Sequence, residues 1–224
     1  MFEAGAGGDA DRWGAVFPET ATFTRACVYN RAGLHRSDPP PTVDRTAADV
    51  ADDLATLLTV AGERPPYVLV AHSLGGVYAR IFAARVGSDV VGIVFDDAFH
   101  PDLFDAQVAA APAEVRDDWL AGMDAAFDQI ESIEGIDWEP TAVQLAGSSV
   151  DGIPVEIIVA SRAYPGLDAE QTAAVDAARL TSFTTLSSQS RVTVADGAGH
   201  FVHLTRPNLV LDAIRRLAMG ARGP

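Results

Sequence analysis

Short apolar stretches alternate along the chain with longer stretches in which apolar residues recur every three or four positions. The short stretches are rich in β-branched residues and nearly continuously apolar, which is typical of strands buried on both faces of a parallel sheet. They cover residues 25–29, 67–70, 90–95, 155–160 and, more weakly, 191–195. This alternation predicts an α/β domain with a mostly parallel sheet and helices on both faces.

Two of the helical patterns are well defined. Residues 43–61 carry a stripe of valine and leucine, and Thr42 is the expected N-cap. Residues 207–219 begin with a proline, which is favoured at the first position of a helix because its φ angle already suits one.

Residues 101–152 break the alternation, because they have helical spacing and contain no strand candidate. Roughly fifty residues between two strands exceed an ordinary crossover. We therefore expect a helical cap at 101–152, inserted into a core formed by residues 1–100 and 153–224. The large apolar side chains of this segment either line a substrate pocket or pack against one another: Trp119, Leu120, Phe127 and Trp138.

Composition narrows the class of protein. The chain has 224 residues, 48% of them hydrophobic, and a formal net charge of −15. This excess of carboxylates repels phosphate groups, so neither nucleic acid nor an anionic membrane surface is an expected partner. No apolar run approaches the roughly 20 residues that span a bilayer, and the first residues do not look like a signal peptide. The single cysteine, Cys27, fits a reducing compartment, so we expect a cytoplasmic protein.

The strongest chemical signal is the sequence Ala71-His72-Ser73-Leu74-Gly75-Gly76, which joins a strand to a helical pattern. A serine on such a sharp turn tolerates only small neighbours two positions away, here Ala71 and Gly75. The turn exposes the Ser73 hydroxyl and places the Leu74 amide at a helix N-terminus, where it can bind an oxyanion. Ser73 could instead be an ordinary helix N-cap, but that role does not require three small neighbours.

Four motifs together resemble the α/β-hydrolase superfamily over nearly the whole chain. The segment from Glu3 to Gly8 is similar to the first oxyanion loop, and residues 28–38 resemble a strand-and-loop signature. Residues 71–76 match the nucleophile turn, and 197–200 match the loop that carries a histidine. The chain departs from the family pattern at three positions: Asn30, His35 and Ala71.

The resemblance implies a Ser–His–Asp triad. His200 follows a strand and a glycine-rich turn, and the ordinary pKa of histidine suits a general base near neutral pH. Two carboxylates end the strand at residues 90–95, and Asp97 is the position that matches the family's acid. Asp96 and Asp168 are the alternatives for this role. No spacing typical of metal ligands occurs, so we expect neither a metal nor another cofactor.

The same resemblance assigns the second oxyanion donor to the amide of Ala6, beside the Leu74 amide. It also places Met1 at the end of a central strand of the family, so roughly 25 to 30 residues found in relatives are expected to be missing here. If they are missing, a weak enzyme or a non-catalytic ligand-binding protein becomes an alternative function.

These residues predict a serine hydrolase that cleaves an ester, thioester or lactone of a small apolar molecule through an acyl-enzyme on Ser73. A C–C bond hydrolase, an amidase or a cofactor-free haloperoxidase would use the same triad, so these alternatives stay open. An aspartate would replace Ser73 in the epoxide hydrolases and dehalogenases of this fold.

Overall fold

The computed structural model describes the chain except for residues 41, 43, 100–106, 162–163, 165 and 221–224. Its centre is a five-stranded sheet in which every neighbouring pair of strands is parallel, with the spatial order β1-β2-β3-β4-β5. The strands are β1 (Phe2–Glu3), β2 (Tyr67–His72), β3 (Val90–Asp96), β4 (Val155–Ala160) and β5 (Ser190–Ala195). The predicted α/β fold with a parallel sheet is confirmed.

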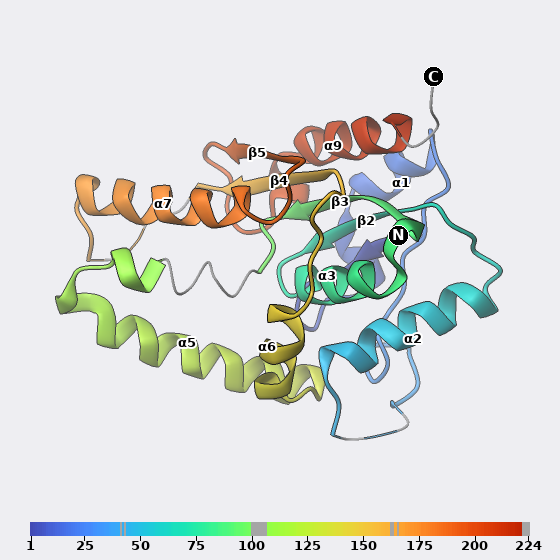
Figure 1. Ribbon diagram of the computed structural model, residues 1–224, viewed down its shortest axis with the longest axis horizontal. Coiled ribbons are helices and arrows are strands. Elements are labelled where there is room, and N and C mark those ends of the chain that lie inside the picture. The colour runs from blue at the N-terminus through green and yellow to red at the C-terminus, as the bar shows by residue number, and fades with distance from the viewer. Residues whose placement is uncertain (41, 43, 100–106, 162–163, 165, 221–224) are drawn as a thin grey trace.

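Helices cover both faces of the sheet (Figure 1). The apolar core on one face includes residues of α2 (Ala47–Val60), α3 (Gly75–Val86), α6 (Trp138–Ala146) and α7 (Ala169–Thr184). The core on the other face includes residues of α1 (Val16–Ala21), α8 (Val202–Thr205) and α9 (Pro207–Gly220). Short 3-10 helices lie at η1 (Ala10–Trp13) and η2 (Gly87–Asp89).

The central strands are mostly apolar because their successive side chains enter different cores. Leu69 of β2 packs in the core with α2 and α3, whereas Val70 packs in the core with α9. This is the arrangement that uninterrupted apolar strands predict. The outermost strand β5 is less buried, and the side chain of Val194 is exposed, which explains its weaker signal in the sequence.

The predicted strand at residues 25–29 is wrong. No strand is described there, although the Phe2 amide donates a hydrogen bond of 2.9 Å to the carbonyl of Cys27. The reason lies in β1, because a neighbour of only two residues cannot support a longer ladder of backbone hydrogen bonds.

The helix predicted at residues 43–61 also begins later than predicted. Helix α2 starts at Ala47 with Thr46 as its N-cap, not Thr42, and Val43 lies outside the described residues. The amide and hydroxyl of Thr46 both donate to the Asp49 carboxylate at 2.8 Å. This capping interaction sets the start of the helix, and the hydrophobic stripe does not reveal it. The predicted helix at 207–219 is confirmed by α9.

The predicted cap segment contains α5 (Ala113–Glu134) and α6, and its first residues lie outside the described part. In Figure 1, α5 runs apart from the sheet and approaches the rest of the fold at its C-terminal end, where α6 begins. The division into a core and a cap stays a prediction.

Candidate active site

Ser73 lies on a sharp turn between β2, which ends at His72, and α3, which begins at Gly75. Its φ angle is +51°, a conformation that a residue with a side chain adopts rarely and that is found at functional sites. The small neighbours are required by packing. A Cβ atom on Gly75 would lie 2.4 Å from the Glu3 carbonyl oxygen, and one on Gly76 would lie 2.7 Å from the Ala98 Cβ.

The peptide that follows Ser73 is held in one orientation. Its carbonyl oxygen accepts hydrogen bonds from the amides of Phe99 at 2.8 Å and Gly76 at 2.9 Å. In a trans peptide the N–H points away from the C=O. The Leu74 amide therefore points away from these donors, and it donates to no residue that the structure describes.

Asp97 and His200 form a hydrogen-bonded pair at the carboxyl end of the sheet. Nδ1 of His200 lies 2.7 Å from Oδ2 of Asp97. The other carboxylate oxygen accepts from the Ala160 amide at 3.0 Å and from the Arg179 guanidinium at 2.5 Å. Asp97 also has a positive φ angle of +42°, so the backbone turns where β3 ends.

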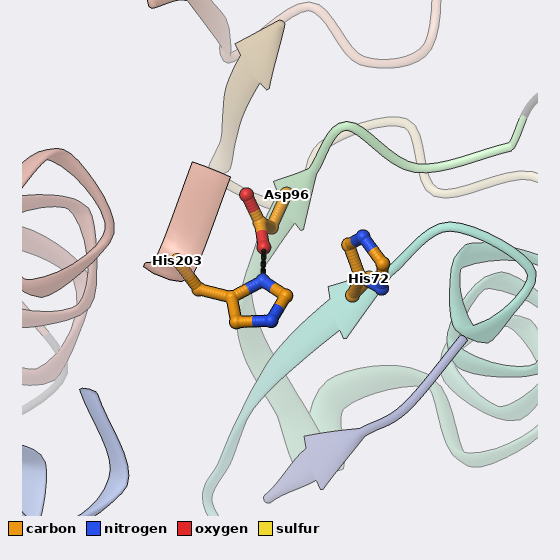
Figure 2. Close-up of side chains that lie close together, drawn as sticks. All are labelled: His72, Asp96 and His203. Carbon is orange, nitrogen blue, oxygen red and sulfur yellow. Dashed lines mark hydrogen bonds and ion pairs between the residues drawn. The ribbon is translucent and has the colours of Figure 1, made fainter. Parts of the chain in front are cut away.

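A second pair lies beside the first. Figure 2 shows Asp96 at the end of β3 with its carboxylate bonded to Nδ1 of His203, while the ring of His72 lies to one side. All three side chains are buried. Burial raises the pKa of Asp96, and the bond to His203 opposes that rise.

His72 connects this second pair to the histidine loop. Its Nε2 lies 3.0 Å from the carbonyl oxygen of His200, so Nε2 carries a proton and donates it to that oxygen. Burial, together with the neighbouring histidines His200 and His203, lowers the pKa of His72 from its ordinary value of 6.5 to about 3. His72 is therefore neutral at physiological pH and holds the backbone of the histidine loop in place.

His72, Asp96 and His203 also offer ligand atoms that all lie within 4.8 Å of one another. Two imidazoles and a carboxylate form a donor set suited to a divalent transition metal. Here, however, the carboxylate and one imidazole are bonded to each other, and the second imidazole is bonded to a carbonyl group. The cluster is thus a hydrogen-bond network, in which Oδ1 of Asp96 has no partner among the described residues.

The N-terminal loop lies directly against the serine. A Cβ atom on Gly5 would lie 3.1 Å from the Ser73 Cβ and 2.9 Å from Nδ1 of His72, so only glycine allows this approach. Ala6 is exposed, and its amide donates to none of the residues described.

One cavity of about 220 Å³ brings these elements together. Both Ser73 and His200 line it, along with the loop residues and the aromatic rings of Trp13 and Phe201. Its described lining is Ala4, Gly5, Ala6, Gly8, Arg12, Trp13, His72, Ser73, His200, Phe201 and His203. The four large apolar residues of the predicted cap are not among them.

Three of those four cap residues pack with other aromatic side chains, and the fourth, Leu120, is exposed. The rings of Phe127 and Trp138 stack with centroids 4.6 Å apart, and both contact Phe99. Trp119 packs against Tyr164 at 5.5 Å. Of the two roles considered for them, this arrangement favours packing over lining the pocket.

The structure therefore places Ser73, His200 and Ala6 around one cavity, with Asp97 bonded to His200. Asp168 lies elsewhere, because its carboxylate caps α7 by accepting from the amides of Glu170 and Gln171. Sequence reasoning missed Arg179, which binds Asp97 from a position 82 residues away in the chain. It assigned no role in the site to Arg31 and Glu134, which hold the N-terminal loop.

Comparison with known proteins finds one family over most of the chain. A model of the Alpha/beta hydrolase family matches residues 4–213. Among solved structures, the chain is similar to a thermophilic esterase from Thermogutta terrifontis, with a TM-score of 0.61 and 21% identity, covering 98% of this chain and 89% of the esterase. A carboxylesterase structure from Nitrososphaera gargenis gives a TM-score of 0.63 and 19% identity, covering 99% and 89%. Similarity at this level of identity concerns the fold.

Curated relatives match over shorter stretches. A probable transporter, efuK from Hormonema carpetanum, is 41% identical over 101 residues, which are 43% of this chain and 14% of that protein. The chain spans between 12% and 38% of the length of the six curated relatives it matches.

None of the helices in the described part of the chain combines the length and apolar character needed to cross a membrane.

Proposed function

Because the chain belongs to the alpha/beta hydrolase family, we propose that it is a serine hydrolase that cleaves an ester, thioester or lactone of a small molecule through an acyl-enzyme on Ser73. The observation that carries this proposal is a single cavity lined by a strained serine and by a histidine whose other ring nitrogen is bonded to a buried aspartate.

In the proposed acylation, His200 takes the proton of the Ser73 hydroxyl as its oxygen attacks the carbonyl carbon of the substrate. Asp97 is bonded to Nδ1 of His200, so Nε2 is the nitrogen available to the serine. The aspartate keeps the ring in this tautomer and stabilises the imidazolium that forms. Arg179 and the Ala160 amide hold Asp97 in turn.

The negative charge that develops on the substrate oxygen needs donors that are already oriented. We assign this role to the amides of Leu74 and Ala6. The Leu74 amide lies at the start of α3, where the helix dipole also favours an anion. The Ala6 amide belongs to the loop that contacts Ser73 through Gly5.

Collapse of the tetrahedral intermediate breaks the bond to the leaving group, which receives the proton from His200. A water molecule then attacks the acyl-enzyme, gives a proton to His200, and Ser73 regains its proton as the acid leaves. In these reaction steps every proton and bond is accounted for without a metal or another cofactor.

The cavity lining indicates which substrates to try first. Trp13 and Phe201 offer apolar surface, Arg12 carries a positive charge, and the described lining contains no carboxylate. We propose that a short acyl group lies against the two aromatic rings, so small p-nitrophenyl esters are suitable probes.

A fluorophosphonate probe tests the proposal directly. The wild-type protein should be labelled at one site per chain and should hydrolyse p-nitrophenyl butyrate, while Ser73→Ala should lose labelling and at least about 10⁴-fold in kcat. A folded wild-type protein that neither reacts with the probe nor hydrolyses any ester would refute this function and favour a ligand-binding role.

A further inference from the structure

A buried arginine, Arg31, is hydrogen-bonded to the backbone of the N-terminal loop. Arg31 is 4% exposed, and its guanidinium donates to the carbonyl oxygens of both Ala4 and Gly5 at 2.7 Å. The same group donates to the carboxylates of Glu3 at 2.7 Å and of Glu134 at 2.7 and 2.9 Å. The guanidinium also lies over the Tyr78 ring of α3, 5.0 Å from its centroid, and its described hydrogen bonds all lead to the loop, to Glu3 beside it or to Glu134.

Glu134 comes from the last turn of α5, 103 residues away from Arg31 in the chain. Its Oε1 atom accepts the Gly7 amide at 2.7 Å in addition to the Arg31 guanidinium. The loop is therefore held on two sides, through carbonyl groups by Arg31 and through an amide by Glu134. We call these two residues the loop clamp.

Burial of these charged groups costs free energy, so the loop clamp is a poor way to stabilise the fold if stability is its only role. Two carboxylates are buried around one guanidinium, and burial raises the pKa of Glu3. Burial by itself would lower the pKa of Arg31, but the facing carboxylates of Glu3 and Glu134 raise it well above its ordinary value. Apolar side chains of similar size often fill such a site with equal or better stability. A requirement for the particular loop conformation explains why charged groups stand here.

The clamp helps to set the direction of the Ala6 amide. The Gly5 carbonyl oxygen accepts from Arg31 and, within the loop, from the Gly8 amide at 3.0 Å, and in a trans peptide the N–H of the next residue points the opposite way. The next amide along, that of Gly7, is directed to Glu134. Between these two fixed peptides, the Ala6 amide is left for a ligand in the cavity that Ala6 lines.

We propose that Arg31 and Glu134 are positioning residues that orient the Ala6 amide toward the reacting carbonyl oxygen, so that the position of helix α5 controls the stabilisation of the oxyanion. This inference rests on the proposed serine hydrolase function. The C-terminal end of α5 would then contribute to the site through Glu134, although none of the described residues of α5 lines the cavity.

Glu134→Ala tests the catalytic consequence, since it leaves Arg31 and Glu3 as a balanced pair. We expect kcat for p-nitrophenyl butyrate to fall about 10- to 100-fold with KM changed less than about threefold, because loss of a whole oxyanion donor costs about 10²- to 10³-fold. Glu134→Gln, which keeps an acceptor for the Gly7 amide, should recover part of this loss. Arg45→Met is the matched control, since Arg45 is a buried arginine that pairs with Asp53 away from the cavity.

Hydrogen exchange of the peptide covering residues 1–13 tests the clamp whether or not the protein hydrolyses esters. Glu134→Ala should speed exchange in this peptide about tenfold or more, and Arg45→Met should not. Unchanged exchange, or equal acceleration in Arg45→Met, overturns the clamp itself. Faster exchange with an unchanged kcat overturns the positioning role. If the wild-type protein is inert toward esters and fluorophosphonate, the proposed function and this role both fail, while exchange still decides the clamp.

Discussion

Two aspartate–histidine pairs lie side by side at the carboxyl end of the sheet. They share the same kind of hydrogen bond but differ in solvent exposure and in the other partners of the aspartate. In each, Nδ1 of a histidine is bonded to the carboxylate of one of two consecutive aspartates, Asp97 with His200 and Asp96 with His203. The side chain of His200 is 41% exposed, whereas that of His203 is 2% exposed. A molecule that arrives from solvent therefore reaches the first histidine more readily than the second.

The partners of the two aspartates explain the difference. Asp97 has a permanent counter-charge in Arg179, so its charge is balanced whichever way His200 is protonated. Asp96 is bonded to His203 instead of to a guanidinium, and its second oxygen, Oδ1, has no hydrogen-bond partner among the described residues. The first pair can thus pass through an imidazolium state during a reaction, and the second is suited to holding a fixed structure. An Asp–His bond alone does not identify a catalytic pair.

The largest expected effect separates the two aspartates. Asp97→Asn should lower kcat by about 10⁴-fold, because an amide favours the wrong tautomer of His200. Asp96→Asn should leave kcat within about tenfold of wild type, since its partner is His203. The measurement is steady-state hydrolysis of p-nitrophenyl butyrate by both variants, with the fraction of active sites titrated by a fluorophosphonate. A large loss in Asp96→Asn alone would reverse our assignment.

The next effect concerns stability. His203→Ala leaves the Asp96 carboxylate buried without its partner, and breaking a buried pair in this way costs about 3–5 kcal/mol of unfolding free energy. Replacing both members by apolar residues, as in Asp96→Val with His203→Leu, should recover most of that loss. Urea unfolding gives both values.

The double variant also tests whether the second pair takes part in catalysis. If the second pair is structural, the protein carrying both apolar replacements should keep its kcat as well as its stability. A stable double variant that has lost activity would show that Asp96 and His203 take part in the chemistry.

The fold and part of the site could be predicted from the sequence because they depend on local patterns. Continuous apolar strands indicated a parallel sheet, and such a sheet gathers the carboxyl ends of its strands at one edge. Ser73 and His200 each follow a strand in the sequence, so their meeting in one cavity could be expected. The catalytic roles of these residues stay predictions.

The rest depends on contacts that no local pattern reveals. Asp96 and Asp97 are adjacent and chemically identical, and what separates them is the positive φ angle at which Asp97 leaves the strand. Arg179 and Glu134 look like ordinary charged residues of long helices, yet each binds a residue more than 80 positions away. The strand expected at 25–29 fails for a similar reason, since a strand exists only where a neighbour can pair with it.

The smallest effect concerns His72, the residue that lies between the two pairs. Its pKa in the folded protein is about 3, below its ordinary value of 6.5, because it is buried next to His200 and His203. Between these two values the unfolded chain binds more protons than the folded one, so unfolding free energy falls as the pH drops from 6.5 toward 3. At pH 5 this contribution amounts to about 2 kcal/mol.

His72→Gln keeps a donor for the His200 carbonyl oxygen and removes the titration. The difference in unfolding free energy between pH 7.5 and pH 5 should therefore be about 2 kcal/mol smaller in this variant than in the wild type. Asp96 titrates in both proteins, so its opposite tendency largely cancels in the comparison. Parallel pH profiles for the two proteins would mean that folding does not lower the pKa of His72, and that His72 is not held neutral.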